Sequence, residues 1–590
     1  MPTITINGTA CDFEPGQTIL QVANAYEIEI PQYCYHDGLS VPAQCRICLV
    51  EAWAPNPRND NKVEPFMGGK LLPSCSTQAS DGMVIRADSP KAVANQKAVM
   101  EYLLINHPLD CPVCDQAGEC FLQDYSYKYG RGVSRFEEQK VKQAKKDLGP
   151  HVYIYADRCI MCTRCVRFTR EVTGSAELMI GGRGNKSEID VFPGRALDNE
   201  LASNVIDLCP VGALLDKDFL FAQRVWFLKT TPSIDPLTAS GDNILIEHNE
   251  GKIYRVKPRT NMEVNRWWIT DEVRYGWKFV HADDRLTTPR ARRFGALDDV
   301  EWARAYDSTL EGIKSATDAG KRLAVSVSPM LSCEDAYHLA TLAKRLDPDA
   351  VLAVGPVPVR GEDKHFPKGI DASDPKAFTV YAEKAPNARG VRRVLEAIGG
   401  SAPLEHDELL AKLGHGTGSS DIGAVLLTGN YPNDWTDDRL SMAIDGKFTA
   451  LIDTLPTGYE NRLDVVMPGA TFAEKAGCFE NAKGMIQAFE QAIPVREGCR
   501  TDSQIALDLL ALAEGEDPIT ADASVVIVDE QPGQVPGAAT IARHSAAVFN
   551  AADTRRAMSE ASSDLGVFTT EVRMPSVEAK QEADVAVVEL

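Results

Sequence analysis

The chain opens with alternating polar and apolar residues, Thr3-Ile4-Thr5-Ile6, a pattern typical of a half-buried strand. The pair Asn7-Gly8 that follows favours a tight hairpin turn. Residues 17–25 place their apolar side chains on one face of a short helix, and Met83-Val84-Ile85 predicts a closing strand. We therefore expect a small sheet with one helix at the start of the chain.

A second helix is predicted from Ser89 to about Asn106. Ser89 can accept hydrogen bonds from the free backbone amides of the first turn, and Pro90 suits the first helical position. This helix runs directly into a group of cysteines. Residues 135–150 are charged and predict an exposed connector, and residues 151–220 hold a further cysteine group.

The pattern changes after about residue 221. Short apolar runs at 324–327, 424–427 and 449–452 read as strands, and helical stretches such as 333–346 lie between them. Alternation of strands and helices indicates a mostly parallel, doubly wound sheet. After about Gly515 the chain is rich in Ala, Asp and Glu with little periodicity, so we expect the last 30 or so residues to be mobile.

These patterns predict a multidomain α+β and α/β protein with five parts. They are a small sheet domain (1–88), two small cysteine-bearing domains (89–134 and 135–220), a doubly wound α/β domain (221–515) and a partly mobile C-terminal extension (516–590).

Composition narrows the function. The formal net charge of −22 argues against nucleic acid as a partner, because phosphate contacts need clustered Lys and Arg. No run approaches the roughly 18–20 apolar residues that cross a bilayer, and the first residues do not resemble a secretory signal. Any membrane association is therefore expected to be indirect.

The fifteen cysteines are unevenly placed, with eleven between Cys34 and Cys209. In a reducing compartment, clustered cysteines bind metal more often than they form disulfides.

The first group is Cys34, Cys45, Cys48 and Cys75. A close Cys-x-x-Cys pair flanked by two distant cysteines, with strands around it, is similar to a plant-type [2Fe–2S] ferredoxin domain, although the spacing differs from that of plant ferredoxins. A zinc site using the same four thiolates is the alternative.

The second group is His107, Cys111, Cys114 and Cys120. Three closely spaced cysteines can bind three irons of a [4Fe–4S] cluster and leave the fourth iron to another ligand. His107 follows a predicted helix four residues before Cys111, but the spacing alone leaves its role open.

The third group is Cys159-x2-Cys162-x2-Cys165 with the distant pair Cys209-Pro210, the bacterial [4Fe–4S] pattern. A two-cluster ferredoxin would have a second cysteine triplet just before Cys209. The residues there are Asn204-Val205-Ile206-Asp207-Leu208, so Cys209 should complete a single cluster.

These motifs resemble those of the large iron–sulfur subunit (75-kDa type) of NADH–quinone oxidoreductase, respiratory complex I. The likeness is carried by Cys45-Arg46-Ile47-Cys48-Leu49-Val50-Glu51, by His107-Pro108-Leu109-Asp110-Cys111-Pro112-Val113-Cys114 and by Val205-Ile206-Asp207-Leu208-Cys209-Pro210-Val211-Gly212. It implies that His107 is a cluster ligand, and that the chain holds one [2Fe–2S] and two [4Fe–4S] clusters. Parts 89–134 and 135–220 would each be a small [4Fe–4S] domain.

The resemblance also implies a function. The chain would relay electrons from NADH and flavin toward quinone in the peripheral arm of a proton-translocating oxidoreductase, with no complete active site of its own. Its partners would be flavoprotein NADH-oxidising subunits, a ferredoxin-like subunit with two [4Fe–4S] clusters, and quinone-module subunits. It would lie on the cytoplasmic side of the bacterial inner membrane, or on the matrix side if mitochondrial. Whether the His107 cluster lies on the main electron path stays open.

Residues 464–481 resemble the molybdopterin oxidoreductase fold, which implies a domain of that type over 221–515. Relatives with a further four-cysteine cluster carry it soon after the third group, whereas residues 210–332 contain no cysteine here. We see no candidate molybdenum ligand either, so no molybdopterin is expected.

Two alternatives remain at this stage. The first is an electron-relay subunit of an NAD-linked hydrogenase or formate dehydrogenase, since these share the amino-terminal modules. The second is a structural protein whose cysteine sites hold zinc.

Overall fold

The computed structural model describes residues 1–414, 420–518 and 548–575. They form two compact units, one made of residues 1–228 with 365–377 and the other of the remaining described residues. The short segment 365–377, which begins within β19 (Lys364–Phe366), belongs to the first unit although it interrupts the second in sequence. The sequence contains no signal for this insertion.

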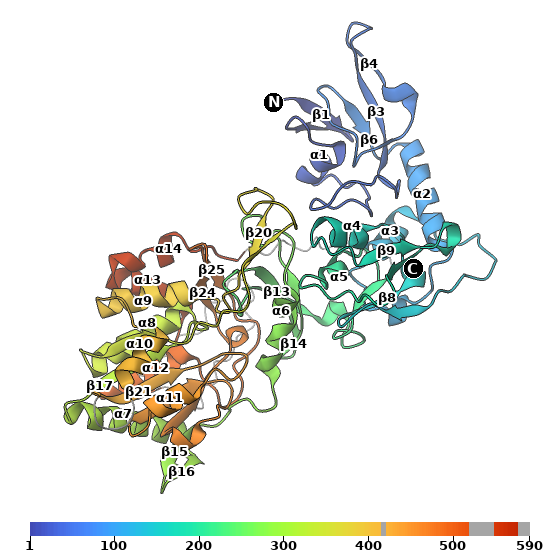
Figure 1. Ribbon diagram of the computed structural model, residues 1–590. Helices are drawn as coiled ribbons and strands as arrows, with labels where there is room; N and C mark the ends of the chain where they lie inside the picture. The colour runs from blue at the N-terminus through green and yellow to red at the C-terminus, as the bar shows by residue number, and fades with distance from the viewer. Residues whose placement is uncertain (415–419, 519–547, 576–590) are drawn as a thin grey trace. The chain divides into compact units, whose positions relative to one another are not determined.

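The first unit begins with a mixed sheet whose strand order is β2-β1-β6-β3-β4, with β5 paired to β3. Asn7 and Gly8 both have positive φ at the hairpin turn, as predicted for this pair. Thr18 and Gln21 form a capping box at the start of α1, which lies beside the sheet (Figure 1). The elements are β1 (Thr3–Ile6), β2 (Thr9–Asp12), α1 (Ile19–Ala25), β3 (Leu49–Asn56), β4 (Lys62–Pro65), β5 (Leu72–Pro73) and β6 (Val84–Arg86). The small sheet with one helix that the sequence predicts is therefore present.

The rest of the first unit consists of short helices and two small sheets. The hydroxyl of Ser89 accepts a hydrogen bond from the Ala92 amide at the start of α2, as expected, and the helix ends at Leu104. The predicted connector contains a short strand, β7, that sequence reasoning missed. The elements are α2 (Pro90–Leu104), α3 (Phe121–Tyr129), β7 (Lys145–Asp147), β8 (Val152–Tyr155), α4 (Arg164–Glu171), β9 (Leu178–Gly181), β10 (Glu188–Val191), α5 (Asn204–Leu208) and β11 (Leu214–Asp216).

The second unit contains a seven-stranded sheet of order β16-β15-β23-β22-β21-β17-β18. The five strands from β23 to β18 are mutually parallel, β15 pairs antiparallel with β23, and β16 pairs antiparallel with β15. These strands are β15 (Arg290–Arg293), β16 (Ala296–Asp299), β17 (Arg322–Val327), β18 (Val351–Val354), β21 (Ile422–Thr428), β22 (Phe448–Asp453) and β23 (Val465–Pro468).

Helices cover both faces of this sheet. Leu323, Val325 and Val327 of β17 pack in one core with α7, α8, α9 and α12, whereas Ala324 belongs to a second core with α10 and α11. This alternation confirms the predicted doubly wound α/β domain. The helices are α7 (Trp302–Asp318), α8 (Cys333–Leu346), α9 (Ala388–Gly399), α10 (His406–Leu413), α11 (Asp438–Ala443) and α12 (Asp502–Glu514).

Smaller elements complete the second unit. The antiparallel sheet β12-β13-β14 and the pair β24-β25 flank the large sheet in sequence. They are β12 (Lys229–Ile234), β13 (Asn243–Asn249), β14 (Lys252–Pro258), α6 (Asp271–Tyr275), β20 (Phe378–Val380), β24 (Gly477–Glu480) and β25 (Ile486–Phe489).

Part of the C-terminal extension forms two helices, α13 (Ala551–Ala561) and α14 (Val567–Thr570). Met558 and Phe568 are fully buried in the same core as α8 and α9. The described residues 551–570 are therefore packed, contrary to the low periodicity read from the sequence. The expected mobility of the last residues concerns mainly 576–590, which lie outside the described part of the chain.

Candidate iron–sulfur sites

The first candidate site brings Cys34, Cys45, Cys48 and Cys75 together from two loops beside the ferredoxin-like sheet. Residues Ala43 and Arg46 have positive φ, which lets the chain wrap tightly around Cys45. The thiols form hydrogen-bonded pairs, Cys34 with Cys45 and Cys75 with Cys48. The hydrogen bond from Cys34 lowers the pKa of Cys45 to about 5, and the bond from Cys75 lowers the pKa of Cys48. These two thiols are therefore prepared to bind as thiolates.

The second candidate site is a cavity bordered by His107, Cys111, Cys114 and Cys120, with Asp110, Arg158 and Gly212 also in its wall. The lining encloses about 280 Å³ of empty space, counting the mouth. His107 follows α2 and Cys120 precedes α3, so the packing of these two helices sets the distance across the cavity.

Burial controls the protonation state of this second site. It lowers the pKa of His107 to about 4, helped by the positive charges of Arg158 and Lys140. The imidazole is therefore neutral at physiological pH, which is the form that binds metal. Burial also raises the pKa of the Cys120 thiol to about 12, so loading a metal group here would release protons.

The third candidate site is a cavity bordered by Cys159, Cys162, Cys165 and Cys209 together with apolar side chains. About 340 Å³ of empty space lies within this lining, counting the mouth. Met161 and Thr163 have positive φ, so the backbone turns sharply between the three clustered cysteines. Burial raises the pKa of Cys159 to about 12 and that of Cys162 to about 11.

The chemistry of the donor sets is suited to metal clusters. Among the described residues, no group of three or more His, Cys, Asp or Glu side chains lies close enough around one point to hold a metal ion. The second and third sets surround cavities, and four-cysteine and mixed cysteine–histidine sets can bind iron–sulfur clusters. The geometry thus fits the predicted cofactors.

The second and third sites share one stretch of backbone, residues 209–212. Cys209 borders the third cavity, whereas a Cβ added to Gly212 would lie 2.2 Å from the Cys114 Sγ of the second. The Pro210 carbonyl accepts a hydrogen bond of 3.1 Å from the Phe121 amide, directly after Cys120. Because three peptide units span at most about 11 Å, the two sites are neighbours.

Sequence reasoning missed three buried arginines at these sites. Arg158 donates to the Asp110 carboxylate at 2.8 Å and to the Gly212 carbonyl at 3.4 Å, and it stacks on the Tyr155 ring. Arg164 and Arg167 lie on α4, beside the third cysteine group. Each is adjacent or close to a cysteine in sequence, but arginines near cysteines are too common for this to be a signal.

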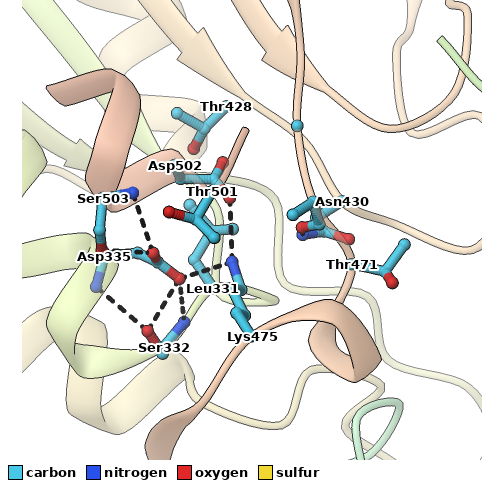
Figure 2. Close-up of polar contacts among 12 residues, drawn as sticks. Leu331, Ser332, Asp335, Thr428, Asn430, Thr471, Lys475, Thr501, Asp502 and Ser503 are labelled. Atoms are coloured by element: carbon cyan, nitrogen blue, oxygen red, sulfur yellow. Dashed lines mark hydrogen bonds and ion pairs between the residues drawn. The ribbon is translucent and has the colours of Figure 1, made fainter. Parts of the chain in front are cut away.

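The second unit has polar side chains at the carboxyl ends of its parallel strands, where doubly wound proteins bind ligands. Thr428 and Asn430, labelled in Figure 2, are two of them, and both are occupied by contacts within the chain. The Thr428 hydroxyl donates to the Ser326 carbonyl and accepts from the Ser328 amide, and the Asn430 amide donates to the Ala470 carbonyl. Such mutual satisfaction suits a scaffold.

Comparisons with known proteins match five family models along the chain. They are a 2Fe–2S cluster binding domain (1–90), the NADH-ubiquinone oxidoreductase-G iron–sulfur binding region (96–135), the ferredoxin-like domain of NADH-quinone oxidoreductase subunit 3 (149–215), the NDSU1/NuoG-like 4Fe–4S domain (228–278) and molybdopterin oxidoreductase (380–512). The segment 228–278 contains no cysteine, so it lacks the thiolates that its model's name implies.

Curated relatives point to the same family. The 78 kDa subunit of mitochondrial NADH-ubiquinone oxidoreductase from Neurospora crassa is 39% identical over 58% of this chain and 44% of its own length. The G subunit of NADH-quinone oxidoreductase from Rickettsia felis is 37% identical over 59% and 49%, and the 75 kDa subunit from Reclinomonas americana is 36% identical over 61% and 50%. The chain thus matches about half the length of these relatives.

Among solved structures, an NAD⁺-reducing [NiFe]-hydrogenase in its H2-reduced state matches 38% of this chain and 91% of its own, with 29% identity and a TM-score of 0.33. No helix in the described part of the chain is both long and apolar enough to span a bilayer. The domain matches and relatives together identify the chain as a homologue of the G subunit of NADH-quinone oxidoreductase and of the 75 and 78 kDa complex I subunits.

Proposed function

We propose that the chain is an electron-transfer subunit of a proton-translocating NADH:quinone oxidoreductase. Three donor sets would hold its clusters. The [2Fe–2S] cluster would bind to Cys34, Cys45, Cys48 and Cys75, one [4Fe–4S] cluster to His107, Cys111, Cys114 and Cys120, and the other to Cys159, Cys162, Cys165 and Cys209. When bound, these clusters supply one-electron transfer, and the chain itself carries no complete active site.

The observation that supports this proposal is that the members of each donor set lie together in the structure although they are separated in sequence. Cysteines up to 50 positions apart, Cys159 and Cys209, border one cavity, and His107 borders another with three cysteines. The neutral state of the His107 imidazole supports its assignment as a ligand. Zinc held by the same four-residue sets is the alternative, and it differs from iron–sulfur clusters in carrying no sulfide.

The backbone of residues 209–212, which both sites share, concerns the path that electrons would take between the clusters. It places the His107 set next to the Cys159 set, with Gly212 against the Cys114 thiol. Such proximity favours electron exchange between these two sites. We therefore propose that the His107 set is part of the main path, the point that the sequence leaves open.

We propose the partners and the location that the family resemblance implies. They are flavoprotein NADH-oxidising subunits, a ferredoxin-like subunit with two [4Fe–4S] clusters and quinone-module subunits, at the cytoplasmic or matrix side of the membrane. We propose no molybdopterin for the second unit, since the polar groups at its strand ends are used internally. Co-purification with a hydrogenase or formate dehydrogenase instead of these subunits would favour the alternative relay role.

An anaerobic assay of iron and acid-labile sulfide tests the proposal. We expect iron and sulfide in the ratio of one binuclear and two tetranuclear clusters, and corresponding EPR signals after reduction. Cys162→Ala should remove one tetranuclear signal and block NADH-to-quinone electron flux in the assembled complex. Zinc without sulfide would refute the cluster assignment, and normal flux in the variant would remove the Cys159 site from the path.

A further inference from the structure

Two buried arginines on α4 connect the Cys34 site with the Cys159 site. Arg164 and Arg167 are 7% and 8% exposed, and they lie one turn apart on the helix that follows Cys162. Arg170, on the same helix, is exposed. The two buried side chains therefore sit at the contact between the two loops, and Arg170 provides a natural comparison.

Arg167 forms hydrogen bonds to the loop that contains Cys34 and to the loop that contains Cys162. Its Nη2 donates to the Cys34 carbonyl and, at 3.5 Å, to the Cys162 carbonyl, while its Nη1 donates to the Ser40 carbonyl. A single guanidinium thus bonds the backbones of two proposed cluster ligands. Its planar fork of donors allows this, whereas an ammonium offers no fixed fork.

Arg164 repeats the arrangement. Its Nη2 donates to the carbonyl of Tyr35, next to Cys34, and its Nη1 donates at 3.4 Å to the carbonyl of Leu208, next to Cys209. Each arginine therefore reaches both proposed cluster sites, and neither contact depends on a side-chain carboxylate.

The charges of these arginines are not cancelled by an ion pair. Within the described residues, neither guanidinium forms a salt bridge, and their hydrogen-bond partners are neutral oxygens. Burial lowers the pKa of Arg167, while the charges of Cys162, Glu171 and Cys34 act in the opposite direction. A buried cation needs compensation, and negatively charged clusters on both sides would supply it.

We propose that Arg164 and Arg167 are positioning residues shared by the Cys34 and Cys159 sites, and that their charge favours the reduced form of both clusters. This inference rests on the cluster ligands assigned under the proposed function. The physical reason is that reduction adds a negative charge beside two fixed cations in a water-poor environment. Net charge and hydrogen bonding are known determinants of iron–sulfur potentials.

The test is an EPR-monitored redox titration of the full chain, with clusters reconstituted anaerobically from iron and sulfide. Arg167→Met removes the charge and the fork, Arg167→Lys keeps the charge but loses the fork, and Arg170→Met removes the same charge from an exposed position. Arg167→Met should lower the reduction equilibrium constant of the binuclear signal and of one tetranuclear signal at least tenfold, or 59 mV for a one-electron couple. Arg167→Lys and Arg170→Met should stay within threefold of the unmodified chain.

The outcomes separate this inference from the proposed function. Unchanged potentials in Arg167→Met, or an equal shift in Arg170→Met, would overturn the inference while leaving the cluster assignment intact. If Arg167→Met assembles no clusters, Arg164→Met takes its place, and loss of clusters from both would show a purely structural role and overturn the inference. If the unmodified chain binds no clusters, the proposed function fails and the inference falls with it.

Discussion

The ammonium of Lys475 offers the most direct test of how the second unit is held together. It is almost fully buried and forms ion pairs of 2.6 Å with Asp335 and 2.9 Å with Asp502 (Figure 2). These carboxylates lie in the first turns of α8 and α12, and Asp335 also accepts hydrogen bonds from the hydroxyls of Ser332 and Ser503. One cation thus joins the starts of two helices.

Replacing Lys475 with Met leaves two buried carboxylates without their common cation. Removing one partner of a buried ion pair costs about 3–5 kcal/mol, and the repulsion between the remaining carboxylates adds to it. Burial already raises the pKa of Asp502 to about 6. Asp502 should therefore take up a proton in the variant at low pH, so we expect the full loss near pH 8 and a smaller loss near pH 5.

Urea unfolding followed by circular dichroism would measure the change in the transition of the second unit. Lys483→Met is the matched control, because Lys483 is exposed and its loss should change stability by no more than about 0.5 kcal/mol. Adding Asp502→Asn to Lys475→Met should recover at least about 1 kcal/mol, since it removes one of the two unpaired charges. A loss below about 1 kcal/mol in the single variant, or no recovery in the double variant, would refute this account.

Three further predictions concern charge, packing and ligation. Burial raises the pKa of Asp235 to about 7 and also raises that of Asp242, so the folded chain binds more protons than the unfolded chain between about pH 4 and 7. The free energy of unfolding, measured by urea titration, should therefore fall as the pH rises through this window. Asp242→Asn should reduce the slope of this free energy against pH by up to about 1.4 kcal/mol per pH unit, and an unchanged slope would contradict this account. Gly212→Ala would place a methyl group 2.2 Å from the sulfur of Cys114, a proposed cluster ligand, and should remove one tetranuclear EPR signal, whereas Gly132→Ala, with open space around it, should leave all signals intact. His107→Cys should keep a cluster but lower its midpoint potential, because thiolate adds a negative charge; the same potential in both proteins would argue against ligation by this histidine.

Local signals account for the parts of the fold that were predicted well. The start of α2 follows from Ser89 and Pro90, and the first hairpin follows from Asn7-Gly8, because capping and turn chemistry act within a few residues. The helix α13 was missed for the opposite reason. Its Arg555 is buried by an ion pair of 2.7 Å with Glu334, 221 positions away, and such a distant partner leaves no mark in the local pattern.

In the candidate sites, too, residues close in sequence could be predicted, whereas contacts between residues far apart in sequence could not. Cysteine spacing predicts the closely spaced members of each set, whereas His107 is assigned from the family resemblance. The arginines beside them could not be assigned a role. Arg167 bonds the carbonyls of Ser40 and Cys34, and its contact with Cys34 spans 133 positions. This contact is apparent only in the structure, where α4 packs against the loop that contains Cys34 and Ser40.

The stretch from Cys209 to Gly212 shows why a short motif can serve two sites at once. Burial raises the pKa of the Cys209 thiol, and hydrogen bonds from the backbone amides of Val211, Leu214 and Ala213 offset part of that rise. To make these bonds the chain must turn immediately after Pro210, and this turn brings Gly212 against the Cys114 thiol, where no side chain fits. The turn that positions Cys209 in the third candidate site therefore also forms a wall of the second, so neither site can be repacked without disturbing the other.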